Sequence, residues 1–138
     1  MTEMPLTGGC LCGGVRYEID QPLVSAVYCH CQRCQRRTGT AAAASARVVP
    51  NSLRVVTGSE LVRRYSPEEG WAKCFCERCG SALWSVDPDD ATSIAVRLGG
   101  IDGDPGIAPD AHQFVRYAAT WEPIRDDGLP RFPERRPS

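Results

Sequence analysis

The sequence predicts a mainly β protein whose short strands are held together by cysteine-bound metal ions. Runs that alternate apolar and polar residues are separated by Gly, Pro, Asn or Asp, which is the pattern of strands joined by turns. Eight cysteines fall into three closely spaced groups. The chain has 138 residues, the length of one domain, and we expect a single domain over residues 1–138.

Six runs have this alternating character and end at turn residues. They are residues 14–19, 23–28, 52–58, 61–66, 81–86 and 93–100. Each is predicted to be a strand. The alanine-rich run 41–46 has high helix propensity, but Gly39 before it and Pro50 after it favour a strand between turns. Residues 111–121 fit either a last strand or a short helix. The Pro- and Arg-rich tail, 126–138, is expected to lie on the surface or to fray.

Composition argues against several classes of partner. The chain carries 16 Lys and Arg against 17 Asp and Glu, a formal net charge of −1, so neither a broad nucleic-acid surface nor a polybasic membrane patch is expected. No run approaches 18 apolar residues, which predicts no membrane span. The N-terminal stretch MTEMPLTGGC lacks the pattern of a signal peptide, and we therefore expect a cytoplasmic protein.

The spacing of the cysteines predicts metal sites rather than disulfides. They form Cys-x-Cys at 10–12, Cys-x-Cys-x-x-Cys at 29–34 and Cys-x-Cys-x-x-Cys at 74–79. Cysteines two or three positions apart close loops too short to stabilise a fold by a disulfide. The same spacing turns two thiolates toward one ion. We therefore expect bound metal, with zinc as the ion that prefers such sulfur ligands.

Four cysteines from the first and last groups together make a complete four-cysteine site. Cys76 and Cys79 form a zinc knuckle, and Gly80 permits the tight turn that follows. Cys10 and Cys12 form a second turn of this kind, flanked by glycines. A structural zinc bound by all four would tie the N-terminal segment to a hairpin far along the sequence and would contribute folding energy directly.

The remaining group, Cys29, Cys31 and Cys34, allows two interpretations. Three thiolates from one short loop can hold zinc with an open fourth position, where an incoming thiol would bind as a thiolate and attack a small carbonyl compound. Alternatively, Cys74 fills the fourth position and closes the site. Cys74 and Cys76 would share one face of a strand, so the spacing leaves both interpretations open.

The two histidines are not expected to bind metal. His30 lies between two predicted ligands, Cys29 and Cys31, and in an extended segment its side chain would point away from theirs. It is expected to be a residue next to the site, a surface residue or a proton carrier. His112 is isolated in the sequence and is expected to be a structural residue whose hydrogen bonds are satisfied.

Arginines cluster beside the three-cysteine group. Arg33, Arg36 and Arg37 follow it closely, and Arg47 lies a little further along. They are either a solvated face or a set of cations that offset the anionic thiolates and bind carboxylates of an acidic thiol. On the second interpretation, Arg36 or Arg37 would hold a substrate carboxylate.

These motifs together resemble those of a known family. The segments that carry the resemblance are GGCLCGGVRYEI at 8–19, YCHCQRCQRRTGT at 28–40, FCERCGSALW at 75–84, VRLGGIDG at 96–103 and TWEPIRDDGLPRF at 120–132. In this order and at these intervals they resemble the glutathione-dependent formaldehyde-activating enzyme (GFA) family, which has the β-tent fold. The resemblance implies several short antiparallel sheets stapled by zinc knuckles.

The resemblance also implies a reaction and assigns residues to it. Cys10, Cys12, Cys76 and Cys79 match the structural zinc site, and Cys29, Cys31 and Cys34 match the catalytic one, whose zinc is expected to be the more labile. The implied reaction adds the thiol of glutathione to formaldehyde, giving S-(hydroxymethyl)glutathione, and is that of a carbon–sulfur lyase. The expected partners are therefore a small thiol and an aldehyde.

Two other functions remain open at this stage. One is a non-catalytic binding module in which Cys74, which is not part of the family pattern, closes the second metal site. The other is a thiol oxidoreductase on the related methionine sulfoxide reductase scaffold, with Cys74 as the nucleophile.

Overall fold

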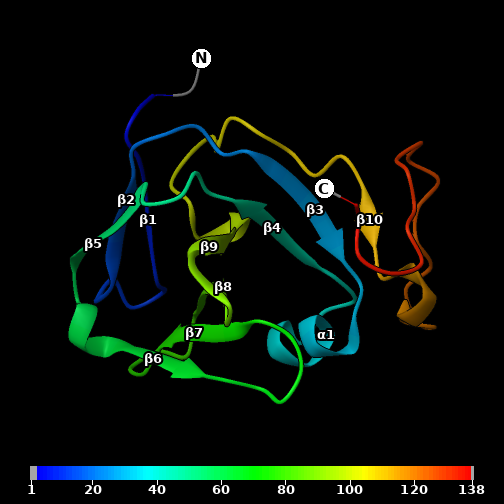
Figure 1. Cartoon of the computed structure of the whole chain (residues 1–138), viewed down its shortest axis with the longest axis horizontal. Coiled ribbons are helices and arrows are strands. Elements are labelled where there is room, and N and C mark those ends of the chain that lie inside the picture. Colours follow the sequence, from blue (N-terminus) through cyan, green and yellow to red (C-terminus); the bar gives the residue numbers. More distant parts are fainter. Residues whose placement is uncertain (1–2, 138) are drawn as a thin grey trace.

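The computed structural model describes residues 3–137 and contains two β-sheets and one α-helix (Figure 1). The smaller sheet has the strand order β1-β2-β5, and the larger has the order β10-β3-β4-β9-β8-β7-β6. The strands are β1 (Leu6–Gly9), β2 (Arg16–Ile19), β3 (Ser25–Cys29), β4 (Ala43–Arg47), β5 (Leu53–Thr57), β6 (Val62–Tyr65), β7 (Ala72–Cys76), β8 (Ala82–Asp87), β9 (Asp90–Arg97) and β10 (His112–Gln113). The prediction of a mainly β fold of antiparallel sheets is confirmed, and β10 and β3 form the one parallel pair of named strands in the described part.

All seven predicted strands are present, including β4, where the flanking turns outweigh the helix propensity of alanine. Two strands without a strong alternating pattern, β1 and β7, were not among the predicted runs. Residues 111–121 form neither a long strand nor an α-helix, but the two-residue β10 followed by the 3₁₀ turn η3 (Val115–Tyr117). Two further 3₁₀ turns are η1 (Ser59–Leu61) and η2 (Leu98–Gly100).

The helix α1 (Gln32–Thr38) was not predicted, because it begins inside the cysteine motif. Its N-cap is Cys31, whose sulfur accepts a hydrogen bond from the amide of Cys34 in place of the usual Ser, Thr, Asp or Asn oxygen. It ends at Gly39, which has the left-handed conformation (φ 69°) that glycine adopts without steric cost. The helix therefore begins after an unusual N-cap residue, Cys31, and ends at a common C-cap residue, Gly39.

The core lies between the two sheets and joins them. Tyr17 of β2 is 1% exposed and meets Trp84 of β8 edge to face, with ring centroids 5.7 Å apart. Gly8 on the neighbouring strand is required here, because a Cβ at this position would lie 2.6 Å from the Tyr17 ring. Ile19 and Val96 are completely buried in the same core. Burial of these apolar side chains is the main force that holds the small sheet against the large one.

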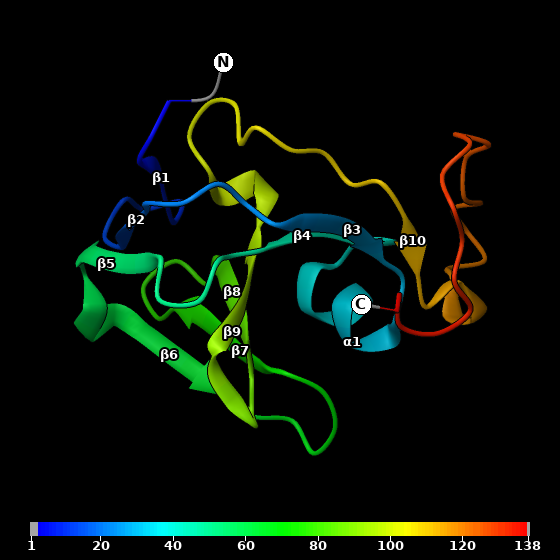
Figure 2. The same cartoon turned by 45° about the horizontal axis from the view of Figure 1, so that its top comes forward.

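The C-terminal segment lies on the surface beside β10 and is hydrogen-bonded to it (Figures 1 and 2). The amide of Phe132 donates to the carbonyl of His112, and the amide of His112 donates to the carbonyl of Pro130. Further along, the amide of Phe114 donates to the carbonyl of Glu134. The described part of the tail, up to residue 137, is thus bonded through its backbone to β10 and to the residues that follow β10.

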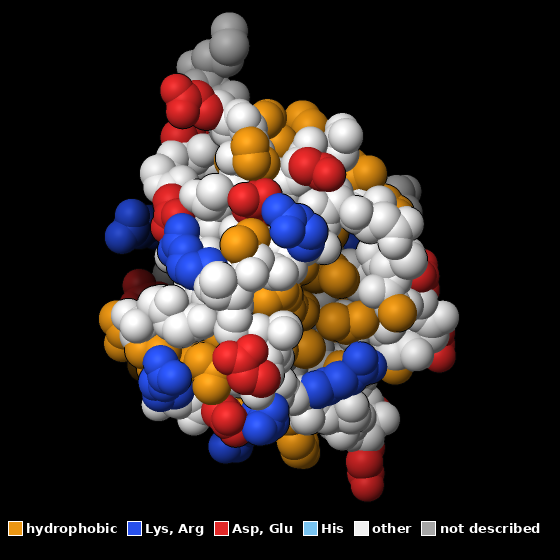
Figure 3. Space-filling view, turned by 90° about the vertical axis from the view of Figure 1, so that its left-hand side faces the viewer, with side chains coloured by type: hydrophobic (Ala, Val, Ile, Leu, Met, Phe, Trp, Pro, Cys, Tyr) orange, Lys and Arg blue, Asp and Glu red, His pale blue; other side chains and the backbone are white. Residues whose placement is uncertain are grey.

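The face over the small sheet carries Lys or Arg and Asp or Glu side chains interspersed, as the balanced composition leads one to expect (Figure 3). Within the described residues, no helix is long and apolar enough to cross a membrane.

Candidate functional site

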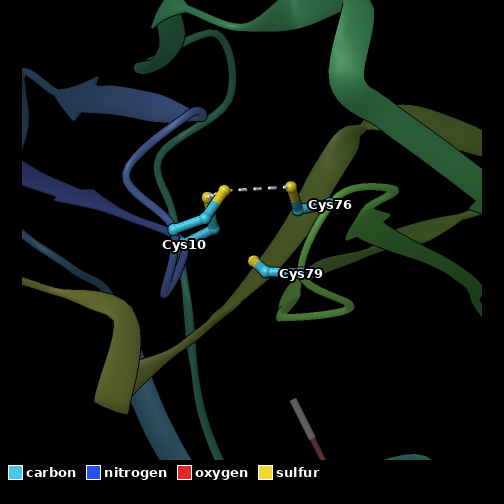
Figure 4. Close-up of side chains that lie close together, drawn as sticks. Cys10, Cys76 and Cys79 are labelled. Carbon is cyan, nitrogen blue, oxygen red and sulfur yellow. Dashed lines mark hydrogen bonds between the residues drawn. The ribbon is translucent and has the colours of Figure 1, made fainter.

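Four cysteines predicted to share a metal converge between the loop after β1 and the turn between β7 and β8 (Figure 4). Their four sulfur atoms lie within 4.8 Å of one another. The sulfurs of Cys10 and Cys12 are 3.5 Å apart, and those of Cys12 and Cys76 are 3.9 Å apart. Tetrahedral zinc with Zn–S bonds of about 2.3 Å requires sulfurs about 3.8 Å apart. The group of Cys10, Cys12, Cys76 and Cys79 thus has the donor set and spacing for a metal ion.

Local backbone structure explains why these sulfurs face inward. The amides of Val15 and Gly14 donate to the sulfurs of Cys10 and Cys12, at 3.2 and 3.4 Å. Such hydrogen bonds stabilise thiolates, the form that binds metal. On the other side, Gly80 has a left-handed conformation (φ 78°), and its amide closes the knuckle on the carbonyl of Cys76 at 2.7 Å.

The second group is built where β3 passes into α1. Cys29 is the last residue of β3, Cys31 is the helix N-cap and Cys34 lies in the first helical turn. The three sulfurs lie within 4.8 Å of one another, and the residues are only 6–7% exposed. The group therefore comes from a strand end and a helix start, not from one short loop as the sequence suggested.

Electrostatics within this group favours a bound cation. Hydrogen bonds from the thiols of Cys29 and Cys34 lower the pKa of Cys31, whereas the hydrogen bond with Cys31 raises the pKa of Cys29. The three sulfurs accordingly share negative charge unevenly, since neighbouring thiolates repel one another. A bound cation removes that repulsion, and three sulfurs of this kind fit zinc.

Cys74 does not belong to either group. It points inward on β7, on the same strand face as Cys76, as expected. It is 5% exposed and packs in the main core with Trp84, whereas the three cysteines form a separate cluster with Ala43 and Phe114. Burial raises the pKa of the Cys74 thiol. The structure thus gives it neither the position of a fourth ligand nor the low pKa of a nucleophilic cysteine.

The three-cysteine group opens onto a cavity of about 660 Å³, a volume typical of small-molecule sites. All three cysteines line it. Among the described residues that line the cavity, none is Asp or Glu, while six are cationic: Arg33, Arg47, Lys73, Arg97, Arg135 and Arg136. The cavity is therefore suited to a small molecule with negative charge.

Four of these six cations were not predicted from the sequence: Lys73 and Arg97 on strands, and Arg135 and Arg136 in the C-terminal segment. Arg97 on β9 faces Ser45 on β4 and donates a hydrogen bond to its hydroxyl, while its Nε and Nη2 atoms are buried without a partner. Lys73 on β7 is half-buried, and burial lowers its pKa. Both residues sit on strands whose other face is apolar. Their convergence depends on the pairing of β4, β9, β8 and β7, which no local motif reveals.

Arg36 and Arg37 do not line the cysteine cavity. They line a second cavity, of about 490 Å³, that none of the three cysteines lines. The guanidinium of Arg37 donates to the carbonyls of Cys74 and Trp84, at 2.5 and 3.2 Å. Of the three arginines of α1, Arg33 lines the cysteine cavity, and it lines the second cavity as well. A carboxylate-binding role for Arg36 or Arg37 stays a prediction, and Arg37 already has backbone partners.

The histidines form a buried chain of hydrogen bonds. His30 is 5% and His112 is 6% exposed, so His30 is not a surface residue. The Nε2 atom of His112 lies 2.8 Å from the carboxylate of Asp127. A carboxylate only accepts, so His112 donates from Nε2 and, when neutral, accepts at Nδ1 from Nε2 of His30. His112 is thus satisfied, as expected.

Comparison with known proteins agrees with the motifs. The family model described as "Glutathione-dependent formaldehyde-activating enzyme" matches residues 5–117. The chain is 30% identical over 128 residues to a protein of Halomonas elongata provisionally named as a glutathione-dependent formaldehyde-activating enzyme, covering 88% of this chain and 82% of that protein. A crystal structure of a Rhodobacter sphaeroides protein is similar with a TM-score of 0.59 and 27% identity, covering 75% of this chain and 97% of the other.

Proposed function

The chain belongs to the glutathione-dependent formaldehyde-activating enzyme family, and from this premise we propose that it is a carbon–sulfur lyase that adds a thiol to formaldehyde or a related small aldehyde. The proposed thiol is glutathione or a similar molecule, and the product with formaldehyde is S-(hydroxymethyl)glutathione. The observation that carries the proposal is the group of Cys29, Cys31 and Cys34, which faces a cationic cavity while Cys74 packs elsewhere.

We assign different roles to the two metal sites. Cys10, Cys12, Cys76 and Cys79 provide a complete set of four sulfur ligands, which fits a structural zinc. Cys29, Cys31 and Cys34 provide three, which fits a catalytic zinc that is more easily lost. Zinc bound there favours the deprotonated form of an incoming thiol. Because all eight cysteines are unpaired, a reducing compartment such as the cytoplasm suits the protein.

The reaction moves one proton and makes one bond. The thiol sulfur bonds to the carbonyl carbon, the π electrons of the C=O bond move to oxygen, and the proton that the thiol lost is returned to that oxygen. Negative charge therefore develops on oxygen before it is protonated. The unpartnered Nε and Nη2 atoms of Arg97 and the ammonium group of Lys73 are donors in the same cavity. We assign them to stabilise and protonate this oxygen.

Exchange NMR tests the proposal directly. Glutathione and formaldehyde interconvert slowly with their adduct in water, and the zinc-loaded protein is expected to accelerate that exchange. The variant Cys34→Ser is expected to lose the acceleration, whereas Cys74→Ser, which alters a cysteine outside the group, is expected to keep it. Failure of the fully zinc-loaded wild type to accelerate exchange would contradict the proposal.

A further inference from the structure

Two arginines that line the cysteine cavity lie against a single indole ring, that of Trp71. The guanidinium carbon of Arg47 lies 4.7 Å from the ring centroid of Trp71, and that of Arg135 lies 5.3 Å from it. Arg47 belongs to β4, whereas Arg135 belongs to the C-terminal segment. All three residues line the cavity that the three cysteines also line. The ring therefore holds two positive charges at one place in the cavity.

These charges have no direct counterion in the part of the chain that the structure describes. Neither Arg47 nor Arg135 forms an ion pair there, whereas the neighbouring Arg136 is paired with Asp110. Burial and then the charge of Arg135 lower the pKa of Arg47, and the charges of Asp87 and Asp90, neither of which lines the cavity, offset this only in part. Two guanidinium groups on one ring repel each other, and an anion near both reduces that repulsion. An anion that binds both would remove a repulsion built into the free protein.

We propose that Arg47 and Arg135, held on Trp71, form a subsite for a carboxylate of the thiol substrate, so that the enzyme selects anionic thiols over neutral ones. The inference rests on the proposed function, because it takes the cavity to be the place where the thiol binds. Planar guanidinium groups bind a carboxylate through two parallel hydrogen bonds, which fixes its orientation as well as its charge. The subsite thereby orients the thiol within the cavity that contains the cysteines.

The C-terminal segment is held in place so that Arg135 reaches the cavity. Next to it, the amide of Arg136 donates to the side-chain oxygen of Gln113 at 3.0 Å, and the Arg136 side chain is paired with Asp110. The family model matches only residues 5–117, so Arg135 lies outside the matched region. Arg47 lies within the region that the family model matches, whereas Arg135 lies beyond it. The subsite therefore combines residues from both parts of the chain. Thiol selectivity is accordingly set in part by this C-terminal segment.

Calorimetric binding to the zinc-loaded protein, without aldehyde, tests the subsite. The probes are glutathione, which carries carboxylates, and 2-mercaptoethanol, which carries none. The hydrogen bonds to a carboxylate are charge-assisted, so Arg135→Gln is expected to weaken glutathione binding by about 10-fold or more. The affinity of the Arg135→Gln variant for 2-mercaptoethanol is expected to stay within about twofold of that of the wild type. Arg47→Gln is expected to behave in the same way.

The matched control is Arg125→Gln, which removes the same charge from an exposed arginine that does not line the cavity. It is expected to bind both thiols as the wild type does. Charge reversal, Arg135→Glu, provides a second measurement and is expected to improve binding of cysteamine, a cationic thiol, relative to glutathione. Metal content and circular dichroism show whether each variant is folded.

Equal glutathione affinity in the wild type and Arg135→Gln would overturn the subsite, and so would equal losses for glutathione and 2-mercaptoethanol. The two proposals fail separately. If Arg135 controls glutathione binding but the wild type does not accelerate exchange with formaldehyde, the subsite stands and the reaction is wrong. If exchange is accelerated and Arg135→Gln binds glutathione normally, the reaction stands and the subsite is wrong.

Discussion

The Nε2 atom of His30 lies 2.8 Å from the Nδ1 atom of His112, a residue 82 positions further along the chain. His112 is bonded in turn to Asp127, so the segment between two site cysteines is connected to the C-terminal segment. The backbone also links His30 to β10, because the amide of His30 donates to the carbonyl of Gln113 at 3.0 Å. The three-cysteine group and the segment that carries Arg135 are thus held by one hydrogen-bonded unit.

We expect Asp127→Asn to loosen the C-terminal segment without unfolding the sheets. The hydrogen bond with His112 lowers the pKa of Asp127 below 3.8, so its stabilising contribution is complete above that pH and is lost as pH falls through the folded-state pKa. The wild type and the variant are therefore compared at one pH, 7, which is well above that pKa. The loosening is measured by hydrogen exchange at the Phe132 amide, which donates to the carbonyl of His112. Equal protection in both proteins would contradict the prediction.

The two metal sites are expected to respond differently to loss of a cysteine. Cys76→Ser should leave the chain unfolded, because a structural zinc contributes about 10–16 kcal/mol and a typical domain is stable by only about 5–15 kcal/mol. Cys34→Ser should remain folded with one zinc per chain instead of two. Metal analysis and thermal unfolding of the two variants measure this contrast, and a Cys34→Ser protein with two tightly bound zinc ions would refute the assignment.

Replacing Cys74 tests whether it is a ligand or a core residue. The side chain is 5% exposed and packs in the main core, so Cys74→Ala should reduce the free energy of unfolding by about 1–2 kcal/mol. Zinc content and zinc affinity should not change. A lower affinity for the second zinc ion, measured by competition with a chelator, would restore the closed-site interpretation.

Arg37 is expected to act in stability rather than in thiol binding. Its guanidinium donates to two backbone carbonyls, of Cys74 and Trp84, and Arg37→Gln removes these bonds. The expected loss is about 2 kcal/mol in the free energy of unfolding, with unchanged glutathione affinity. Arg36→Gln, at an exposed position of the same helix, is the control and should change stability by less than about 0.5 kcal/mol. Weaker glutathione binding by either variant would support the role predicted from sequence.

Lys73 is the only lysine in the chain, which makes its titration directly observable. Burial lowers its pKa below 10.5, so the unfolded chain binds more protons than the folded one between the two pKa values, and stability rises with pH across that interval. Labelling with ¹³C-lysine should show one resonance that titrates below 10.5. Lys73→Met should be at least as stable as wild type at pH 7–8, and its advantage should shrink toward pH 10. A normal pKa would refute the prediction.

Local spacing explains why so much of the candidate site was predictable. Cys-x-Cys and Cys-x-x-Cys place two sulfurs together whatever the rest of the fold does, so the cysteines of both groups followed from the sequence. Alternation identified strands that have one buried face, such as β2. The helix α1 was missed because its N-cap is Cys31, and cysteine is not a usual cap residue.

The sequence by itself determined a mainly β chain with closely spaced cysteine ligands at 10–12, 29–34 and 76–79, because strand alternation and ligand spacing are properties of neighbouring residues. Only the tertiary structure decided that Cys74 packs in the core, that Arg97 and Lys73 share a cavity with the cysteines, and that Arg135 meets Arg47 on Trp71. These relationships join residues on different strands and on the C-terminal segment. They depend on strand order and register, which are set by long-range pairing and by burial of the common core.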